Sequence, residues 1–346
     1  MGLSWPDVLD SLLDGDDLDA PTAQACLAEV IGGGTDPLVT AAFLTALRAK
    51  GETAEEVAGL ARSMREHAVR VPVPGDAPLL DTCGTGGDRC GTVNVSTMAA
   101  LVCAGAGVRV AKHGNRAASS ACGSADVLEA LGVRIELPPE GVLACLEEAN
   151  IGFFFAPAYH PAMKAVNPVR RALGVRTVFN LLGPLANPAG VTRQVIGVPA
   201  KDLGELVAHA LAGLGAVRAF VVHGADGLDE LSTTGANEVW EIRDGGVHHT
   251  VLDSEDLGLA RGSLDDLRGG DAGVNATVAR ATLDGRGGAV RDIVLLNAAA
   301  GLVAADAASG WHDALELASA SIDSGAAAGC LERMVEVSNR SEWPVL

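Results

Sequence analysis

Residues 81–120 read DTCGTGGDRCGTVNVSTMAALVCAGAGVRVAKHGNRAASS and contain two glycine-rich turns, residues 83–88 and 112–120, on either side of one apolar segment. The first turn follows the short apolar segment 79–80, which we expect to be a strand. The polar residues 94–97 after this turn can cap the helix that follows. The stretch therefore predicts a strand, a glycine loop and a helix whose N-terminus points at the loop.

A loop of this kind favours an anion. Free backbone N–H groups and the positive end of a helix dipole attract negative charge, and glycines let the backbone approach oxygen atoms closely. Spacing excludes two common phosphate motifs, because a dinucleotide fingerprint needs a glycine at Arg89 and a P-loop needs a lysine after Gly86-Gly87. The first turn is interpreted as a phosphate cradle, and a tight turn that binds nothing is the alternative.

The second turn carries cations. Lys112, His113 and Arg116 lie together, after the strand expected at residues 108–111 and before a helix expected to open at residues 124–126. A lysine offers an anion a point charge, and an arginine offers a planar fork. This cluster indicates a second phosphate-binding loop, and a solvated basic loop is the alternative.

Length and composition bound the remaining possibilities. The 346 residues suffice for two domains, and the 48% hydrophobic content excludes a disordered chain. A net charge of −19 argues against a nonspecific nucleic-acid binder, so a phosphate ligand must be held locally, with the help of a divalent metal. Seven cysteines without a Cys-x-x-Cys pair indicate reduced thiols and a cytoplasmic protein. We find no secretory signal and no segment long enough to span a membrane.

The chain begins with short predicted helices over residues 6–67. Asp36-Pro37 gives one helix an N-cap with proline at its first position, and Thr53 with Glu56 forms a capping box for the next. Residues 71–75, rich in proline, end this helical domain.

Apolar segments then alternate with helical patterns, which predicts an α/β domain with a mostly parallel sheet covered by helices on both faces. Expected strands are 79–80, 108–110, 151–155, 195–198 and 219–222. Helical pieces broken by prolines fill residues 157–188, a hairpin is expected over 238–252, and Ala-rich helices over 290–305 and 312–322.

Two adjacent acids, Asp229 and Glu230, follow the strand expected at 219–222. Carboxylate oxygens together with substrate phosphate oxygens and waters suit Mg²⁺, so both acids are candidate metal ligands. A turn with solvated acids is the alternative.

The turn Gly84-Thr85-Gly86-Gly87-Asp88, the segment 94–97 and the run 112–120 resemble the signature segments of anthranilate phosphoribosyltransferases, enzymes of tryptophan biosynthesis. The similarity in order and spacing extends over nearly the whole chain. It implies transfer of the phosphoribosyl group of 5-phosphoribosyl 1-diphosphate (PRPP) to the amine of anthranilate. It further implies a small helical domain of residues 1–71 with a returning segment at about 165–188, a large domain of residues 76–164 and 189–346, and a homodimer formed through the small domains.

The resemblance also implies site residues. PRPP would contact the two turns and the helix start, namely Gly84, Gly87, Asp88, Thr92, Asn94, Val95, Ser96, Thr97, Lys112, His113, Gly114, Asn115, Arg116, Ala117, Ala118, Ser119, Ser120 and Ser124. Mg²⁺ would be held by Ser96, Asp229 and Glu230. Anthranilate would meet Gly84, Asn115 and Arg170, the last through its carboxylate. No residue is assigned as a general acid or base, because an aniline-type nitrogen is already unprotonated near neutral pH.

Arg89-Cys90 departs from the family, which more often has small residues in this loop. Three alternatives stay open: a pyrimidine nucleoside phosphorylase of the same architecture, a noncatalytic paralogue that binds nucleic acid or a protein partner, and a transferase for another aromatic amine. The pattern of Lys112 to Arg116 favours the transferase over the phosphorylase.

Overall fold

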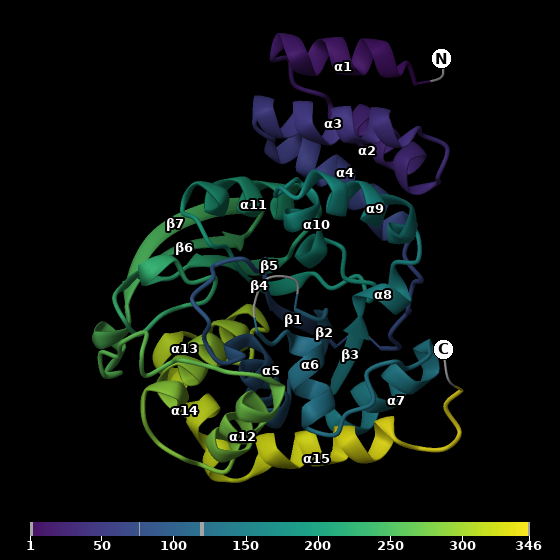
Figure 1. Ribbon diagram of the computed structural model, residues 1–346. Coiled ribbons are helices and arrows are strands. Elements are labelled where there is room, and N and C mark those ends of the chain that lie inside the picture. Colours follow the sequence, from purple (N-terminus) through teal and green to yellow (C-terminus); the bar gives the residue numbers. More distant parts are fainter. Residues whose placement is uncertain (1–2, 76, 118–120, 345–346) are drawn as a thin grey trace.

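The computed structural model describes residues 3–75, 77–117 and 121–344, and its first part is a bundle of four helices (Figure 1). These are α1 (Trp5–Asp14), α2 (Ala20–Ile31), α3 (Pro37–Lys50) and α4 (Ala54–Glu66). The predicted caps are confirmed, since Asp36 accepts a hydrogen bond from the N–H of Leu38, and Thr53 with Glu56 forms the capping box.

The described residues also form one sheet of seven strands in the order β3-β2-β1-β4-β5-β6-β7. The strands are β1 (Leu79–Gly84), β2 (Arg109–Gly114), β3 (Ile151–Phe155), β4 (Arg193–Gly197), β5 (Arg218–His223), β6 (Ala236–Arg243) and β7 (Gly246–Asp253). The first five are parallel, and β6 with β7 forms the predicted antiparallel hairpin. The predicted fold class, a small helical domain followed by an α/β domain, is confirmed.

The strand order reverses beside β1. The chain passes from β1 to β2 and β3 on one side, then returns to β4 and β5 on the other. In open α/β sheets, ligands bind outside the carboxyl ends of the strands at such a reversal. The first glycine turn follows β1 and therefore lies at the expected place.

Two strand boundaries differ from the sequence-based expectation. Residues Cys83 and Gly84 were assigned to the first turn, but they pair with Ile196 and Gly197 of β4. Lys112, His113 and Gly114 were assigned to the second turn, but they belong to β2 and pair with β3. The strands are longer because β4 and β3 offer partners for these backbone groups, which local sequence does not reveal.

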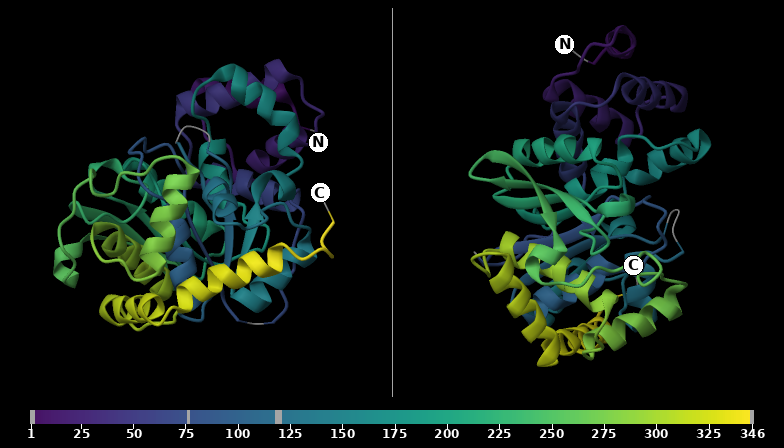
Figure 2. Two further views of the ribbon diagram at one scale, coloured as in Figure 1. Left: turned by 60° about the horizontal axis from the view of Figure 1, so that its bottom comes forward. Right: turned by 90° about the vertical axis from the view of Figure 1, so that its left-hand side faces the viewer.

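Helices cover both faces of the sheet (Figure 2). Alternate strand residues enter two apolar cores: Val195 and Phe220 face one core, and Ile196 and Val221 face the other. The first core includes residues of α5 (Val95–Gly105), α6 (Ser124–Ala130), α7 (Pro139–Ala149), α12 (Ala272–Leu283), α13 (Ala289–Ala304), α14 (Trp311–Asp323) and α15 (Ala326–Ser338). These include the predicted Ala-rich helices.

The second core joins the sheet to the N-terminal bundle through α9 (Met163–Leu173), α10 (Phe179–Leu185) and α11 (Asp202–Gly213). Helix α9 packs against α2 and α3, and α10 packs against α4. The short α8 (Ala156–Tyr159) precedes them, which matches the predicted run of helical pieces. None of the helices in the described ranges is long and apolar enough to cross a membrane.

Candidate active site

A cavity of about 930 Å³ opens at the carboxyl ends of β1 and β2. Its walls come from the two glycine turns, the start of α5, the acidic segment after β5, and the segment that contains α8, α9 and α10. Every predicted site residue that the structure describes lines this one cavity. Ala118, Ser119 and Ser120 lie outside the described residues. The structure thus brings the predicted residues together, while their individual roles stay predictions.

The first turn is attached to the acidic segment. The N–H of Gly86 donates to Oδ2 of Asp229 at 2.7 Å. Glycines at the ends of β1 and β4 make this possible, because a Cβ on Gly84 would overlap the Asp229 carboxylate and a Cβ on Gly197 would overlap its backbone oxygen. The acid and the turn are therefore in direct contact, although 143 residues separate them.

The predicted cap at the start of α5 is wrong. Asn94 occupies the N-cap position but makes no capping hydrogen bond with its side chain. Its amide nitrogen donates to the backbone oxygen of Cys122, and its amide oxygen accepts from Asn275. The N–H of Ser96 in the first helical turn donates instead to Oε1 of Glu230 at 3.1 Å. The carboxylate of Glu230, distant in the sequence, therefore accepts a hydrogen bond from one of the helix N–H groups that have no partner within the helix.

Asp229 and Glu230 are crowded acids. Burial, together with the nearby Glu230 and Asp88, raises the pKa of Asp229 well above its usual range. Burial raises the pKa of Glu230 to about 7, against the opposing effect of Lys112. Two neighbouring carboxylates that ionise with difficulty are stabilised when a cation shares their charge, and Ser96 adds a hydroxyl oxygen beside Glu230. This oxygen-only set suits a hard divalent ion.

Lys112 is buried in β2 and does not belong to a solvated basic loop. Its Nζ donates to the backbone oxygen of Thr82 at 2.6 Å, and the side chain is 1% exposed. Its charge opposes the burial that raises the pKa of Asp81 to about 6 and that of Glu230. Lys112 therefore compensates buried acids beneath the cavity.

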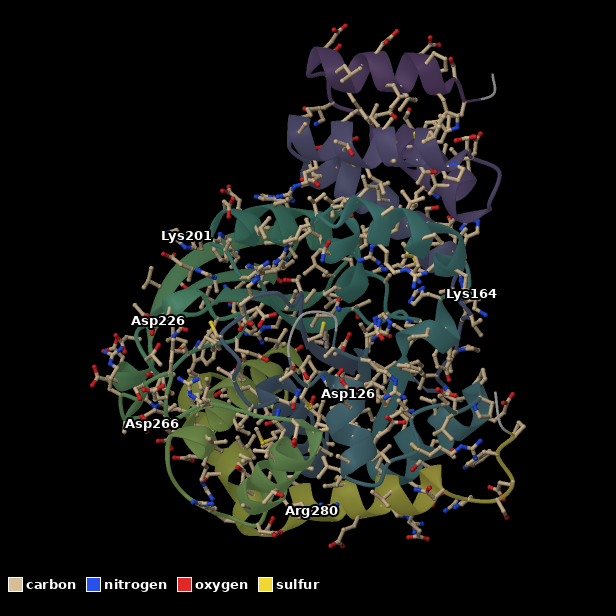
Figure 3. All side chains as sticks on the ribbon, viewed as in Figure 1. Asp126, Lys164, Lys201, Asp226, Asp266 and Arg280 are labelled. Carbon is tan, nitrogen blue, oxygen red and sulfur yellow. The ribbon has the colours of Figure 1, made fainter. Side chains whose placement is uncertain are left out.

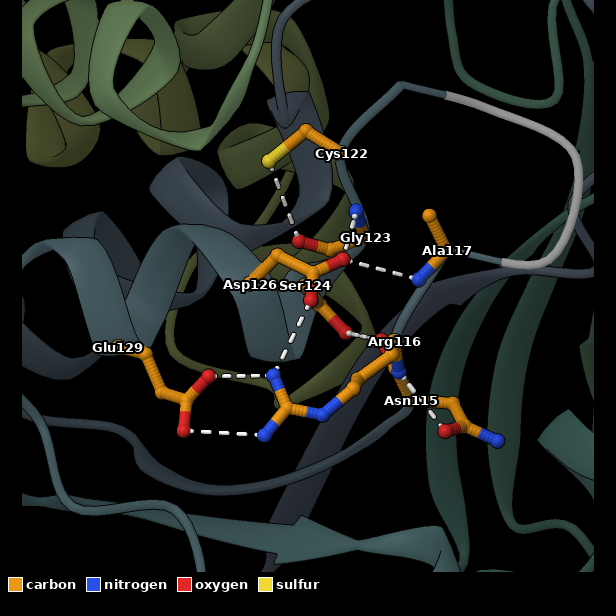
Figure 4. A network of polar contacts seen from close by, with 8 residues as sticks. All are labelled: Asn115, Arg116, Ala117, Cys122, Gly123, Ser124, Asp126 and Glu129. Carbon is orange, nitrogen blue, oxygen red and sulfur yellow. Dashed lines mark hydrogen bonds and ion pairs between the residues drawn. The ribbon is translucent and has the colours of Figure 1, made fainter.

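The second turn closes on its own helix (Figure 4). Asp126 of α6 accepts hydrogen bonds from the N–H groups of Ala117 at 2.9 Å and Gly123 at 2.8 Å. Arg116 forms ion pairs with Asp126 and Glu129 and lies 5.6 Å from the ring centre of Phe155. The predicted helix start near Ser124 is confirmed, and the exposed cation of this turn is already paired with acids.

His113 and His160 face each other with ring centres 5.2 Å apart. Burial lowers the pKa of His113 to about 3 and that of His160 to about 4, so both rings are neutral at pH 7. Nδ1 of His113 lies 3.1 Å from the backbone oxygen of Gly183. His113 therefore supplies no positive charge, contrary to its place in the predicted cationic cluster, and His160 is a lining residue that the sequence did not single out.

Three arginines of the segment that carries α9 and α10 line the cavity, namely Arg170, Arg171 and Arg176. Arg170 packs against the face of Phe179, 5.2 Å from the ring centre, and burial lowers its pKa. Within the described residues it forms no ion pair. Arg176 donates to the backbone oxygens of Gly86 at 3.3 Å and Gly87 at 3.4 Å. The contact of Arg176 with this turn was not predicted, because nothing in the local sequence distinguishes Arg176 from the neighbouring arginines.

Comparisons with known proteins agree on one family. A model described as a glycosyl transferase family α/β domain matches residues 76–328, and one described as a glycosyl transferase family helical bundle domain matches residues 6–68. The anthranilate phosphoribosyltransferase of Rubrobacter xylanophilus is 53% identical over 327 residues, which cover 94% of this chain and 95% of the relative. The anthranilate phosphoribosyltransferase of Chloroflexus aggregans is 53% identical over 324 residues, covering 93% and 95%.

The chain belongs to the anthranilate phosphoribosyltransferase family. Solved structures agree. The enzyme of this family from Thermus thermophilus superposes with a TM-score of 0.91 at 46% identity, covering 96% of this chain and all of the other. The enzyme from Saccharomyces cerevisiae, solved with PRPP and Mg, has a TM-score of 0.88 at 29% identity, covering 96% and 97%.

Family membership confirms the predicted enzyme class, a phosphoribosyltransferase of tryptophan biosynthesis. The alternatives of a nucleoside phosphorylase and a noncatalytic paralogue receive no support from these relatives.

Arg89 and Cys90 are the residues at which this chain departs from the family pattern. Arg89 adopts a left-handed backbone conformation, with φ of 60°. The Sγ of Cys90 contacts the backbone oxygens of Asp88 and Asp226. Cys90 is therefore packed into the loop.

Proposed function

We propose that the chain joins anthranilate to PRPP and releases diphosphate. The amine nitrogen forms a bond to the anomeric carbon of the ribose while the bond from that carbon to the diphosphate oxygen breaks. The amine proton then passes to solvent. Positive charge develops on the sugar and negative charge on the leaving diphosphate, so positioning and electrostatic stabilisation are the main demands on the protein.

The two glycine turns are the proposed PRPP site. The carrying observation is that both turns, the acidic pair and Arg170 line one cavity at the reversal of strand order. Gly87 and Asp88 of the first turn would offer backbone N–H groups to phosphate oxygens. The second turn would hold the other end of the substrate through its own backbone and Arg116.

Mg²⁺ would be held by Ser96, Asp229 and Glu230, together with phosphate oxygens and waters. The described residues contain no cluster of three or more His, Cys, Asp or Glu side chains that could hold a metal ion alone. A site of two carboxylates therefore fits an ion that arrives with its substrate. When bound, the ion would offset the negative charge that grows on the diphosphate.

Anthranilate would enter beside Arg170, Asn115 and Gly84. Arg170 is desolvated against Phe179 and has no acid partner among the described residues, so its fork is free for a carboxylate. The solved yeast relative with 4-fluoroanthranilate supports this choice of substrate class. The neutral His113 and His160 pair adds no competing positive charge. No side chain is needed as a base, because the amine is already unprotonated.

We also propose the assembly that the resemblance implies and the cytoplasmic location that the cysteines indicate. Residues 1–71 with about 165–188 would form the small domain, and residues 76–164 and 189–346 the large one. The small domains would pair in a homodimer, for which Leu13 and Leu38 offer apolar side chains that are 73% and 81% exposed. The seven cysteines form no disulfide bond within the described residues, which is compatible with the cytoplasm.

The loss of anthranilate fluorescence with PRPP and Mg²⁺ tests this function. We expect the signal to fall only when protein, PRPP and metal are all present, with one diphosphate released for each anthranilate consumed. Phosphorolysis of uridine or thymidine without turnover of PRPP would instead favour the phosphorylase. Consumption of a different aromatic amine, with no consumption of anthranilate, would support phosphoribosyl transfer but contradict anthranilate as the substrate.

A further inference from the structure

Arg176 connects the segment between α9 and α10 to the first glycine turn. Its Nη2 donates to the backbone oxygen of Gly86 and its Nη1 to that of Gly87. The approach is close, because a Cβ on Gly87 would overlap Nη1. One guanidinium therefore contacts two successive peptide groups of a turn that lies about ninety residues away in the sequence.

These contacts fix the direction of two N–H groups. In a planar trans peptide the carbonyl oxygen and the following N–H point in opposite directions. When Arg176 holds the oxygens of Gly86 and Gly87, the N–H groups of Gly87 and Asp88 must point away from the guanidinium. Neither N–H has a hydrogen-bond partner within the described residues. They are available to an anion.

Such a constraint is needed because the turn does not fix itself. Gly86 and Gly87 have φ of +74° and +86°, and glycine peptide planes rotate with little steric resistance. The other long-range hydrogen bonds of the turn run from the Thr85 N–H to the backbone oxygen of Gly197 and from the Gly86 N–H to Asp229, and they hold different peptide groups. Arg176 thus orients the two peptide groups after Gly86 and Gly87, which the bond to Asp229 leaves free to rotate.

We propose that Arg176 is a positioning residue that orients the Gly87 and Asp88 N–H groups toward the diphosphate of PRPP, an inference that rests on the proposed function. Arg176 lies six residues after Arg170, on the segment that packs against the helical bundle. Through it, the part of the protein that would bind anthranilate also holds the turn that would bind diphosphate.

Calorimetric titration of PRPP with Mg²⁺ into Arg176→Ala tests the proposal, alongside steady-state kinetics. We expect the dissociation constant for PRPP to rise roughly tenfold, which corresponds to the free energy of one charge-assisted hydrogen bond. The KM for anthranilate should change less than threefold. Arg176→Lys, which can hold one carbonyl, should recover part of the loss. Arg62→Ala is a matched control, since Arg62 also joins the bundle to a backbone oxygen, that of Gly213, but lies outside the cavity.

Gly87→Ala tests the same contact from the side of the turn, because its Cβ would displace the guanidinium of Arg176. It should lower the affinity for PRPP, and it should lower it less once Arg176 is alanine, so the two effects will not multiply. Effects that multiply fully, or an anthranilate KM that rises more than that for PRPP, would overturn the proposal. Equal affinity of wild type and Arg176→Ala for PRPP would overturn it too. Absence of PRPP binding to the wild type would instead refute the proposed function itself.

Discussion

The two glycine-rich turns look alike in sequence but are held in different ways. The first is anchored from afar, by Asp229 at a separation of 143 residues and by Arg176 at separations of 89 and 90. The second is anchored locally, by Asp126 at separations of 3 and 9 and by an ion pair between Arg116 and Glu129 at a separation of 13. The first turn therefore depends on the assembled fold, and the second depends mainly on one short helix.

This difference predicts which substitutions should alter function most. Changes to Asp229 should alter PRPP binding and metal dependence together, because Asp229 anchors the first turn and is a proposed metal ligand. Loss of the ion pair between Arg116 and Glu129 in the second turn should have a small and local effect, because the Asp126 bonds remain.

The largest effect is expected for Asp229→Asn combined with Glu230→Gln. Loss of both charges should lower Mg²⁺-dependent turnover about a thousandfold, since metal stabilisation of a leaving group contributes several kcal/mol. Turnover at saturating substrates across a range of Mg²⁺ concentrations is the measurement. Asp226→Asn is the control, because this acid lies at the periphery of the molecule (Figure 3), is exposed, and has φ of 60°, which asparagine tolerates. Undiminished activity of the double variant would remove both acids from the metal site.

Arg170→Ala should differ from Arg176→Ala in the substrate whose KM it raises. We expect the KM for anthranilate to rise about thirtyfold, because a charge-assisted pair to a carboxylate is lost. The KM for PRPP should change little, in contrast to Arg176→Ala. Arg280→Ala, an exposed arginine on α12, serves as the control (Figure 3). A PRPP effect larger than the anthranilate effect would contradict the role given to Arg170.

The paired histidines should make the protein less stable in acid. A histidine whose pKa is lowered by folding is neutral in both states above its ordinary pKa of about 6.5, whereas below this value the unfolded chain takes up a proton that the folded chain excludes. With folded pKa values of about 3 and about 4, each histidine should lower the free energy of unfolding by about 2 kcal/mol between pH 7 and pH 5.

Denaturant unfolding of the wild type and His160→Asn at these two pH values measures the effect. The variant keeps a side-chain hydrogen-bond donor but no longer titrates. Its loss of stability between pH 7 and pH 5 should be smaller by about 2 kcal/mol. Equal losses in both proteins would show that His160 is protonated in the folded state.

The smallest effect is expected for Glu129→Gln. The ion pair with Arg116 is exposed, so its removal should leave the melting temperature nearly unchanged. Freed from Glu129, Arg116 should bind phosphate slightly better and lower the KM for PRPP about twofold at low salt, with less effect at high salt. Glu336→Gln, which breaks an exposed pair with Arg333, is the matched control. A PRPP KM that rises would mean that Glu129 positions Arg116 for its substrate.

The sequence predicted the fold and the location of the site because those depend on local patterns. The capping box of Thr53 and Glu56, the alternating apolar segments and the glycine turns all act over a few residues. The contacts that define the site chemically act over long separations. Three features follow from packing between distant segments. Lys112 is buried, the Ser96 N–H donates to Glu230, and Arg176 rather than a neighbouring arginine contacts the first turn. No local signal specifies them.

Titration of PRPP into the wild-type protein by calorimetry, with Mg²⁺ in excess and without it, tests most directly whether the cavity holds an activated sugar phosphate. We predict saturable binding of one PRPP per chain that weakens strongly when the metal is chelated and when Asp229 and Glu230 are replaced. A folded protein that gives no binding heat with PRPP and excess Mg²⁺ would contradict the account.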